Sequence, residues 1–141
     1  MQTSTKITTV TEMEALGVEI ATRLNVGDLV ILRGELAAGK TVLVRGFGAG
    51  LGITEQISSP TFVIARRHLG PIPLTHVDLY RLLDHSNVRA EVGDLDVEAD
   101  LTTGVVVVEW GDETFFDEVR LVVNIAITSP EEREVTLDWR S

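Results

Sequence analysis

The stretch DLVILRGELAAGKT, residues 28–41, decides the fold that we expect for this chain of 141 residues. Its first half is a short apolar run, typical of a strand buried on both faces of a parallel sheet. Its second half, Gly34 to Thr41, fits the pattern G-x-x-x-x-G-K-[ST], in which flexible backbone wraps around phosphate oxygens. The pattern predicts a strand, a phosphate-binding loop and a helix, with a nucleoside triphosphate as the ligand.

The loop combines three kinds of phosphate-binding group. Lys40 supplies a compact cation for the terminal phosphates, and the Thr41 hydroxyl is a ligand for Mg²⁺. The backbone around them completes the site, whose candidate residues are Gly34, Glu35, Leu36, Ala37, Ala38, Gly39, Lys40, Thr41 and Val42. The competing interpretation is a glycine-rich turn with a solvated lysine, which the flanking strand and helix patterns disfavour.

Helix patterns lie on both sides of this stretch. Upstream, Thr11 and Glu14 predict a capping box, and the apolar residues that follow at helical spacing run to Leu24. Downstream, the helix expected after Lys40 contains three glycines, each of which costs a helix up to about 1 kcal/mol relative to alanine. Either that helix is short or its glycines allow close packing on the sheet.

Five further segments predict strands, at residues 62–68, 74–80, 105–108, 120–128 and 132–139. The run 105–108 is uniformly β-branched and suits the centre of a sheet, whereas 74–80 alternates as a half-buried strand does. Residues 129–132 predict a hairpin turn. We expect one domain over residues 1–141, with a three-layer α/β, P-loop NTPase-like fold. Its central sheet would be mostly parallel, with antiparallel C-terminal edge strands.

Composition narrows the classes of function. The formal net charge of −10 disfavours direct, non-specific binding of nucleic acid, although acidity that only aids solubility has at least equal weight. The absence of cysteine excludes disulfides and thiolate metal sites. We expect no membrane association and a cytoplasmic location, because no apolar run is long enough to span a membrane and the N-terminus lacks an apolar signal core.

An acidic group near the loop is needed to organise Mg²⁺. Glu109 follows the run 105–108, where the carboxyl end of a parallel strand meets the ligand crevice. Asp78 stands near the end of another predicted strand, and a plain strand-end carboxylate is an even alternative there. His76 is a candidate general base, although a single histidine in a strand is more often a packing residue. The acidic stretch 91–100 is most simply a solvated face.

Four motifs, taken in order, resemble the TsaE (YjeE) family of small bacterial ATPases, which act in threonylcarbamoyl-adenosine (t6A) biosynthesis on tRNA. They are Gly34–Thr41, Ser59-Pro60-Thr61-Phe62, the segment 76–82, and Val108-Glu109-Trp110. The resemblance covers nearly the whole chain. It implies a P-loop ATPase with ATP and Mg²⁺ as its cofactors.

The resemblance also implies roles for individual residues. Lys40, Thr61, Asp78 and Glu109 would be catalytic; Thr41 and Glu109 would hold Mg²⁺, and Thr61 and Asp78 would sense the γ-phosphate or position its attacking water. The switch or partner-contacting set would be Ser59, Pro60, His76, Tyr80, Arg81 and Trp110. Thr11 and Met13, at the start of the first helix, would lie near the base, and Arg133 is a further candidate for nucleotide binding.

The chain departs from the family pattern at two places. The family commonly has glycine where this chain has Ala37, and a positive φ there would cost alanine of the order of 1 kcal/mol. Gly111-Asp112, after the tryptophan, also differs from the commoner proline- or glycine-then-glutamate ending.

The partners implied by the resemblance are TsaD, which transfers the threonylcarbamoyl group to tRNA, and TsaB. The chain would reach tRNA only through them, would hydrolyse ATP slowly alone, and would support multiple turnover in the complex. A small-molecule kinase with the same loop is the alternative, although residues 84–103 contain only Arg89 for an arginine-bearing lid. A nucleotide-gated binding module without hydrolysis is a third possibility, which the sequence does not separate from the first.

Overall fold

The computed structural model describes residues 2–35, 37–54, 57, 65–79, 97–111, 113–116 and 118–140. Their elements, in chain order, are β1 (Gln2–Ile7), α1 (Val10–Ala21), β2 (Leu29–Gly34), α2 (Lys40–Gly50), β3 (Ala65–His68), β4 (Leu74–Asp78), α4 (Val97–Leu101), β5 (Val105–Glu109), the 3₁₀ helix η2 (Glu113–Phe115), β6 (Leu121–Ser129) and β7 (Glu132–Trp139). None of the described helices is long and apolar enough to cross a membrane.

The seven described strands form one sheet in the order β1-β7-β6-β2-β5-β4-β3. The central strands β6, β2, β5 and β4 are parallel, while β7 and β1 at one edge and β3 at the other are antiparallel. This confirms the predicted α/β class, the parallel centre and the antiparallel C-terminal hairpin. Strand β1 was not predicted from the sequence, because its residues are polar and all but Ile7 are exposed.

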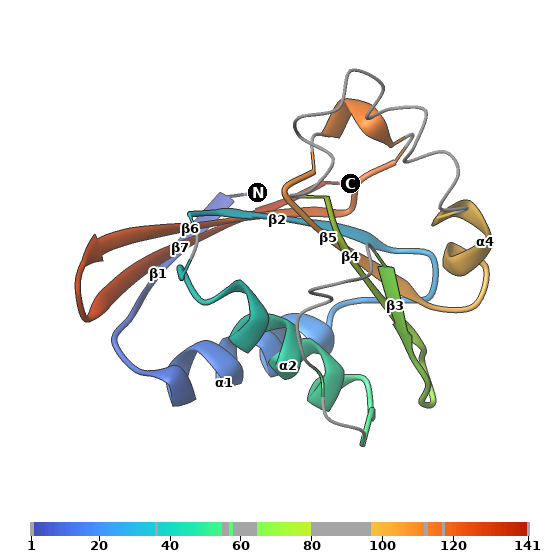
Figure 1. Ribbon diagram of the computed structural model, residues 1–141, viewed down its shortest axis with the longest axis horizontal. Helices are drawn as coiled ribbons and strands as arrows, with labels where there is room; N and C mark the ends of the chain where they lie inside the picture. Colours follow the sequence, from blue (N-terminus) through green and yellow to red (C-terminus); the bar gives the residue numbers. More distant parts are fainter. Residues whose placement is uncertain are drawn as a thin grey trace.

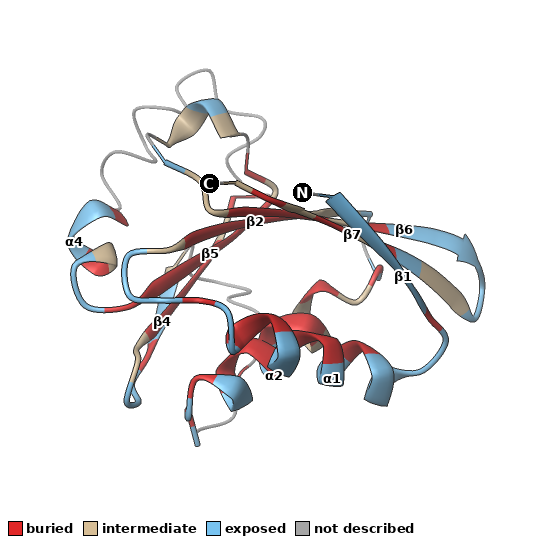
Figure 2. Cartoon of the chain, turned by 180° about the vertical axis from the view of Figure 1, so that it is seen from behind, coloured by how far each residue is buried: buried red, intermediate tan, exposed pale blue. Residues whose placement is uncertain are grey.

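The sheet lies between α1 and α2 on one face and α4 with η2 on the other, which gives the expected three layers (Figures 1 and 2). On one face, α1 and α2 pack on alternate residues of the strands through side chains such as Ile20, Leu43 and Phe47. On the other face, a smaller cluster packs against α4 and the aromatic rings of Phe115 and Phe116. Among the described residues, this second layer contains the five-residue helix α4 and the short helix η2.

Glycines let α1 and α2 approach closely. Helix α2 runs for 11 residues despite its three glycines. A Cβ added to Gly46 would lie 2.2 Å from the carbonyl oxygen of Glu14, and one added to Gly17 would lie 2.4 Å from that of Leu43. Helix α2 is therefore not shortened by its glycines. They allow close packing against helix α1, whereas the sequence suggested close packing on the sheet.

Three sequence-based expectations are corrected by the structure. Helix α1 is capped by Thr9 and Glu12 instead of Thr11 and Glu14, because Thr9-Val10-Thr11-Glu12 is the same capping pattern two residues earlier. Strand β4 is buried on both faces because Leu74 packs in the cluster under α1 and α2, while Val77 packs in the cluster on the opposite face. In the acidic stretch 91–100, Asp100 is buried and forms an ion pair with Arg67 of β3 instead of facing solvent.

Candidate functional site

The glycine-rich loop, Gly34 to Thr41, connects the carboxyl end of central strand β2 to helix α2. The register of the sheet brings two acidic residues to the same end, since Glu109 pairs with Leu32 of β2 and with Asp78 of β4. The N-cap of α2 is Gly39, which has no side chain that could accept a hydrogen bond from the first-turn amides. This is the end of the sheet at which ligands of open α/β folds bind.

Backbone conformation shapes the loop. Gly39 has φ 108° and Ala37 has φ 65°. Ala37 therefore adopts the positive φ at which alanine costs of the order of 1 kcal/mol relative to glycine.

Lys40 is buried, with 6% of its surface exposed. Its ammonium donates a hydrogen bond to the carbonyl oxygen of Gly34 at 2.6 Å and lies 3.7 Å from the centre of the Trp110 ring. Burial lowers the pKa of this ammonium below its ordinary value, while the carboxylates of Glu109 and Asp78 act in the opposite direction. The side chain that we expect to meet phosphate is thus held against its own loop and a neighbouring ring.

Glu109 ends the uniformly buried strand β5, and 3% of its surface is exposed. One of its oxygens, Oε2, contacts Nε2 of His76, a fully buried histidine of β4. Asp78, two residues after His76 and on the same face of the sheet, is half-buried. The structure therefore brings together Lys40, Asp78 and Glu109, as the sequence predicted. His76, which the resemblance assigns to the switch or partner-contacting set, is fully buried within the sheet.

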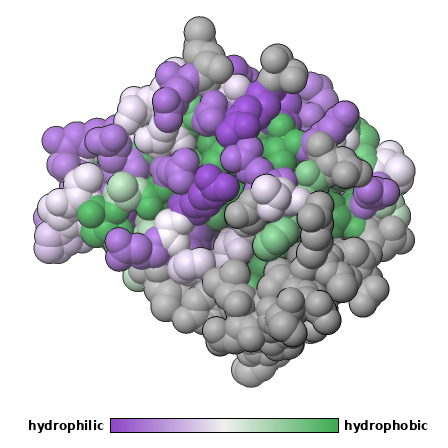
Figure 3. Space-filling model, turned by 90° about the horizontal axis from the view of Figure 1, so that it is seen from above, coloured by the Kyte–Doolittle hydropathy of each residue, from purple (hydrophilic) through white to green (hydrophobic). Residues whose placement is uncertain are grey.

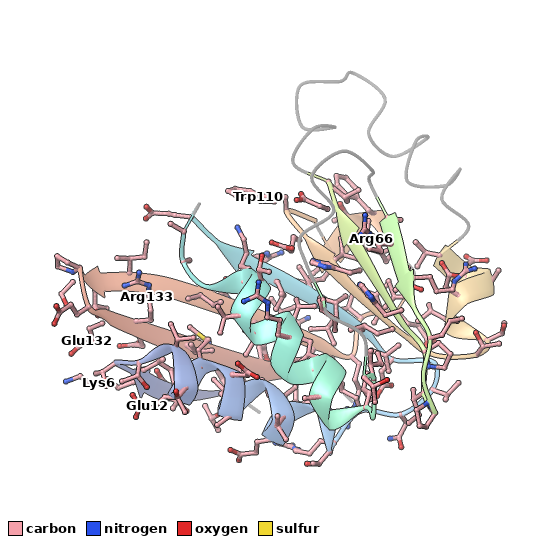
Figure 4. The ribbon with its side chains drawn as sticks, turned by 60° about the horizontal axis from the view of Figure 1, so that its bottom comes forward. Lys6, Glu12, Arg66, Trp110, Glu132 and Arg133 are labelled. Carbon is pink, nitrogen blue, oxygen red and sulfur yellow. The ribbon has the colours of Figure 1, made fainter. Side chains whose placement is uncertain are left out.

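Trp110 follows Glu109 in a left-handed conformation, with φ 62°. Its side chain lies close to the glycine-rich loop, as Figure 4 shows, and its backbone N–H is 3.4 Å from the carbonyl oxygen of Leu32. A positive φ is a rare and costly conformation for a bulky residue. The turn directs the indole ring across the Lys40 ammonium.

Arg133, at the start of β7, contacts the loop from the side of β2 that faces away from β5 and β4. Its Nε donates to the carbonyl oxygen of Ala38 at 3.2 Å, and its Nη2 donates to that of Ala37 at 3.4 Å. Its Nη1 donates to the carbonyl oxygen of Ser129 at 3.1 Å, within the β6–β7 turn. Arg133 therefore braces the glycine-rich loop by donating hydrogen bonds to the carbonyl oxygens of the loop.

A cavity of about 500 Å³ lies beside the loop. Three segments line it: residues 7–10 with Met13, residues 37–39 with Val42, and the hairpin residues Pro130, Glu131 and Arg133. Met13 and Arg133 line this cavity and Thr11 does not, because α1 starts two residues earlier than predicted and Thr9 takes the place at its N-terminus. Sequence reasoning missed the hairpin tip, which reaches the loop only through the pairing of β6 with β7.

Several predicted residues lie outside the part of the chain that the structure describes, namely Leu36, Ser59, Pro60, Thr61, Tyr80 and Arg81. Among the described residues, no three histidine or acidic side chains cluster as a metal site. Of the two expected Mg²⁺ ligands, Thr41 is half-buried in the first turn of α2 and Glu109 ends β5. Hydrophilic residues surround smaller apolar areas on the face seen in Figure 3.

These features define the class: an α/β protein with a glycine-rich loop between a central parallel strand and the helix that follows it. The family model of the threonylcarbamoyl adenosine biosynthesis protein TsaE matches residues 7–135. The chain belongs to the TsaE family.

Individual relatives agree with this assignment. The chain is 48% identical over 135 residues to a tRNA threonylcarbamoyladenosine biosynthesis protein TsaE from Streptomyces coelicolor, across 89% of this chain and 88% of the relative. It is 36% identical over 126 residues to the protein of that name from Treponema pallidum, across 86% and 89% of the two chains. The crystal structure of Bacillus subtilis YdiB superposes with a TM-score of 0.82 and 30% identity, covering 100% of this chain and 87% of that one.

Proposed function

We propose that this protein is a Mg²⁺-dependent ATPase that acts with TsaD and TsaB in the threonylcarbamoylation of adenosine in tRNA. The observation that carries the proposal is the buried Lys40 ammonium at the N-terminus of α2, near the carboxylates of Glu109 and Asp78. One end of the parallel sheet holds a cation, helix amides and two acids. This set of groups suits a nucleoside triphosphate with its metal ion.

The arrangement supports an extended ligand. The glycine-rich loop and Lys40 would hold the phosphates, because backbone amides and an ammonium are both donors to phosphate oxygens. The cavity beside the loop, between α1 and the β6–β7 turn, would take the base and sugar. Its lining includes Ile7, Val10 and Met13, which offer apolar surface to a ring.

The donor set fits Mg²⁺. In phosphate sites this ion takes one or two protein oxygens and completes its shell with phosphate and water, so Thr41 and Glu109 suffice as ligands. Bound there, Mg²⁺ would neutralise charge on the phosphate oxygens. Lys40 would leave the carbonyl oxygen of Gly34 to reach the terminal phosphate.

Hydrolysis also needs a group that orients water. Asp78 is the described carboxylate for this role, because it ends β4 beside Glu109 and is not fully buried. Thr61 is the other candidate that the resemblance implies.

The proposal also includes the dependence of ATP hydrolysis on the partners and the location of the protein in the cell. A site that TsaD and TsaB complete would hydrolyse ATP slowly in the free subunit. The net charge of −10 favours contact with tRNA through the partners, in the cytoplasm.

The test measures t6A on tRNA with reconstituted TsaD and TsaB and either wild type, Lys40→Ala, Lys6→Ala or no added protein. Lys6 is the only other lysine, and it pairs with Glu132 at 2.9 Å on the sheet edge, so Lys6→Ala is the matched control (Figure 4). We expect product beyond one turnover only with wild type and Lys6→Ala. Magnesium-dependent nucleotide binding should weaken only in Lys40→Ala, which loses a charge-assisted contact worth about 1.5–3 kcal/mol.

Equal product in all four reactions would contradict the assigned pathway. Normal nucleotide binding by Lys40→Ala would contradict the assigned site. A phosphorylated small molecule formed from a metabolite pool would favour the kinase alternative.

A further inference from the structure

The contact between His76 and Glu109 joins two buried polar side chains on neighbouring parallel strands. His76 has no exposed surface, and Glu109 is 3% exposed. In the register of β4 and β5, Asp78 pairs with Glu109 and His76 pairs with Val107, so the His76 side chain lies diagonally behind Glu109 on the same face. The histidine is therefore on the core side of the carboxylate, away from the end of the sheet where the loop lies.

The chemistry of the pair fixes which group donates. A carboxylate only accepts hydrogen bonds, so Nε2 of His76 carries the hydrogen that points at Oε2 of Glu109. The other ring nitrogen, Nδ1, is buried and has no hydrogen-bond partner among the residues that the structure describes. Packing alone would be served by an apolar side chain, because a buried polar atom without a partner costs free energy. The pair thus has a use that offsets this cost.

We propose that His76 is a positioning residue, which fixes the orientation of the Glu109 carboxylate so that Oε1 is presented to Mg²⁺. This inference rests on the proposed function, in which Glu109 holds the metal. A buried histidine on an interior strand has little freedom to move, and its hydrogen bond removes rotation of the carboxylate before the metal binds. Removing a residue that hydrogen-bonds to a metal ligand typically changes metal affinity or activity about 10–100-fold.

Substitutions that keep or remove the donor separate positioning from packing. His76→Gln retains an amide N–H that can take the place of Nε2, whereas His76→Leu fills the space without a donor. His68→Leu is the matched control, since His68 is also buried but lies on β3 opposite Leu74, at the far end of β4 from Glu109. All three variants are compared with wild type.

The experiment measures ADP affinity by calorimetry with saturating Mg²⁺ and with EDTA, and also the rise in melting temperature with ADP as Mg²⁺ is added. In wild type, Mg²⁺ should tighten ADP binding. In His76→Leu we expect at least a tenfold loss of that gain with little change in EDTA, and in His76→Gln most of the gain should return. His68→Leu should behave as wild type.

A double-mutant cycle separates an effect that acts through Glu109 from independent effects of each substitution. If His76 acts through Glu109, His76→Leu should have no further effect on the Mg²⁺-dependent gain in a Glu109→Gln background. Additive losses, or a full Mg²⁺-dependent gain in His76→Leu, would overturn the positioning role while leaving the proposed function intact. Wild type without any Mg²⁺-dependent ADP binding would overturn both.

Discussion

The Lys40 ammonium lies between the ring of Trp110, at 3.7 Å from the ring centre, and the carbonyl oxygen of Gly34, at 2.6 Å. Both contacts satisfy a cation that is buried and has lost part of its hydration. A phosphate group that enters the loop must compete with them. The resting arrangement would therefore set a cost on the first step of the proposed nucleotide binding.

Removing the aromatic ring should lower that cost. A cation–π contact contributes about 0.5–1 kcal/mol at an exposed site and about 2 kcal/mol when desolvated, so Trp110→Leu should bind ADP roughly two- to thirtyfold more tightly. Trp110→Phe should lie between the two, since the phenyl ring is a weaker partner. Calorimetry on the free subunit measures this, and weaker binding by Trp110→Leu would show that the ring contacts the nucleotide favourably.

Loss of the Arg133 brace should weaken nucleotide binding without unfolding the sheet. Arg133→Met removes the donors to the carbonyl oxygens of Ala37 and Ala38, and Arg133→Lys cannot reproduce the planar fork. We expect ADP affinity to fall about tenfold in both, which corresponds to about 1.4 kcal/mol. Lys6→Met, which removes a cation beside the same hairpin without touching the loop, is the control. Unchanged affinity in Arg133→Met would show that the loop keeps its shape without the brace.

Glycine at position 37 should stabilise the protein. Ala37 adopts φ 65°, so Ala37→Gly relieves about 1–2 kcal/mol of strain and loses part of it to the greater entropy of the unfolded chain. The net effect on the free energy of unfolding, measured by urea titration, should be a gain of about 0.5–1 kcal/mol. Ala38→Gly, at the next residue, where φ is not positive, should lower it instead. A loss in both variants would contradict the strain.

A methyl group at Gly46 should disrupt the contact between α1 and α2. Alanine favours an isolated helix by up to about 1 kcal/mol, but here its Cβ would lie 2.2 Å from the backbone oxygen of Glu14. Gly46→Ala should therefore reduce the free energy of unfolding by about 2 kcal/mol or more. Ala49→Gly, on the exposed face of the same helix, should cost about 1 kcal/mol through propensity alone. A more stable Gly46→Ala protein would mean that the helices separate easily.

Local sequence patterns predicted the parts of the fold that depend on neighbouring residues. The apolar run before Gly34 and the valines before Glu109 predicted the two central strands, and the loop motif predicted the start of α2 at Lys40. Strand β1 was not predicted, because an edge strand with polar residues shows no hydrophobic alternation. The helix start was misplaced because threonine and glutamate recur at both possible positions of the cap.

Contacts between segments far apart in the chain could not be predicted from the sequence. Arg133 meets Ala38 only because the hairpin places β7 beside β6, and β6 pairs with β2. His76 meets Glu109 because β4 and β5 are adjacent in register. Strand order decides both contacts, and a single sequence does not encode strand order as a local pattern.

The polar strand β1 connects the beginning of the chain to the site. It has one neighbour, β7, and its last residue, Ile7, pairs with Arg133, while both residues line the cavity beside the loop. An edge strand with few buried side chains opens easily, so its amide hydrogens exchange with solvent faster than those of β2 or β5. A ligand seated in the cavity would hold Ile7 and Arg133 together, and hydrogen–deuterium exchange would then slow in the first strand, far along the sequence from Lys40.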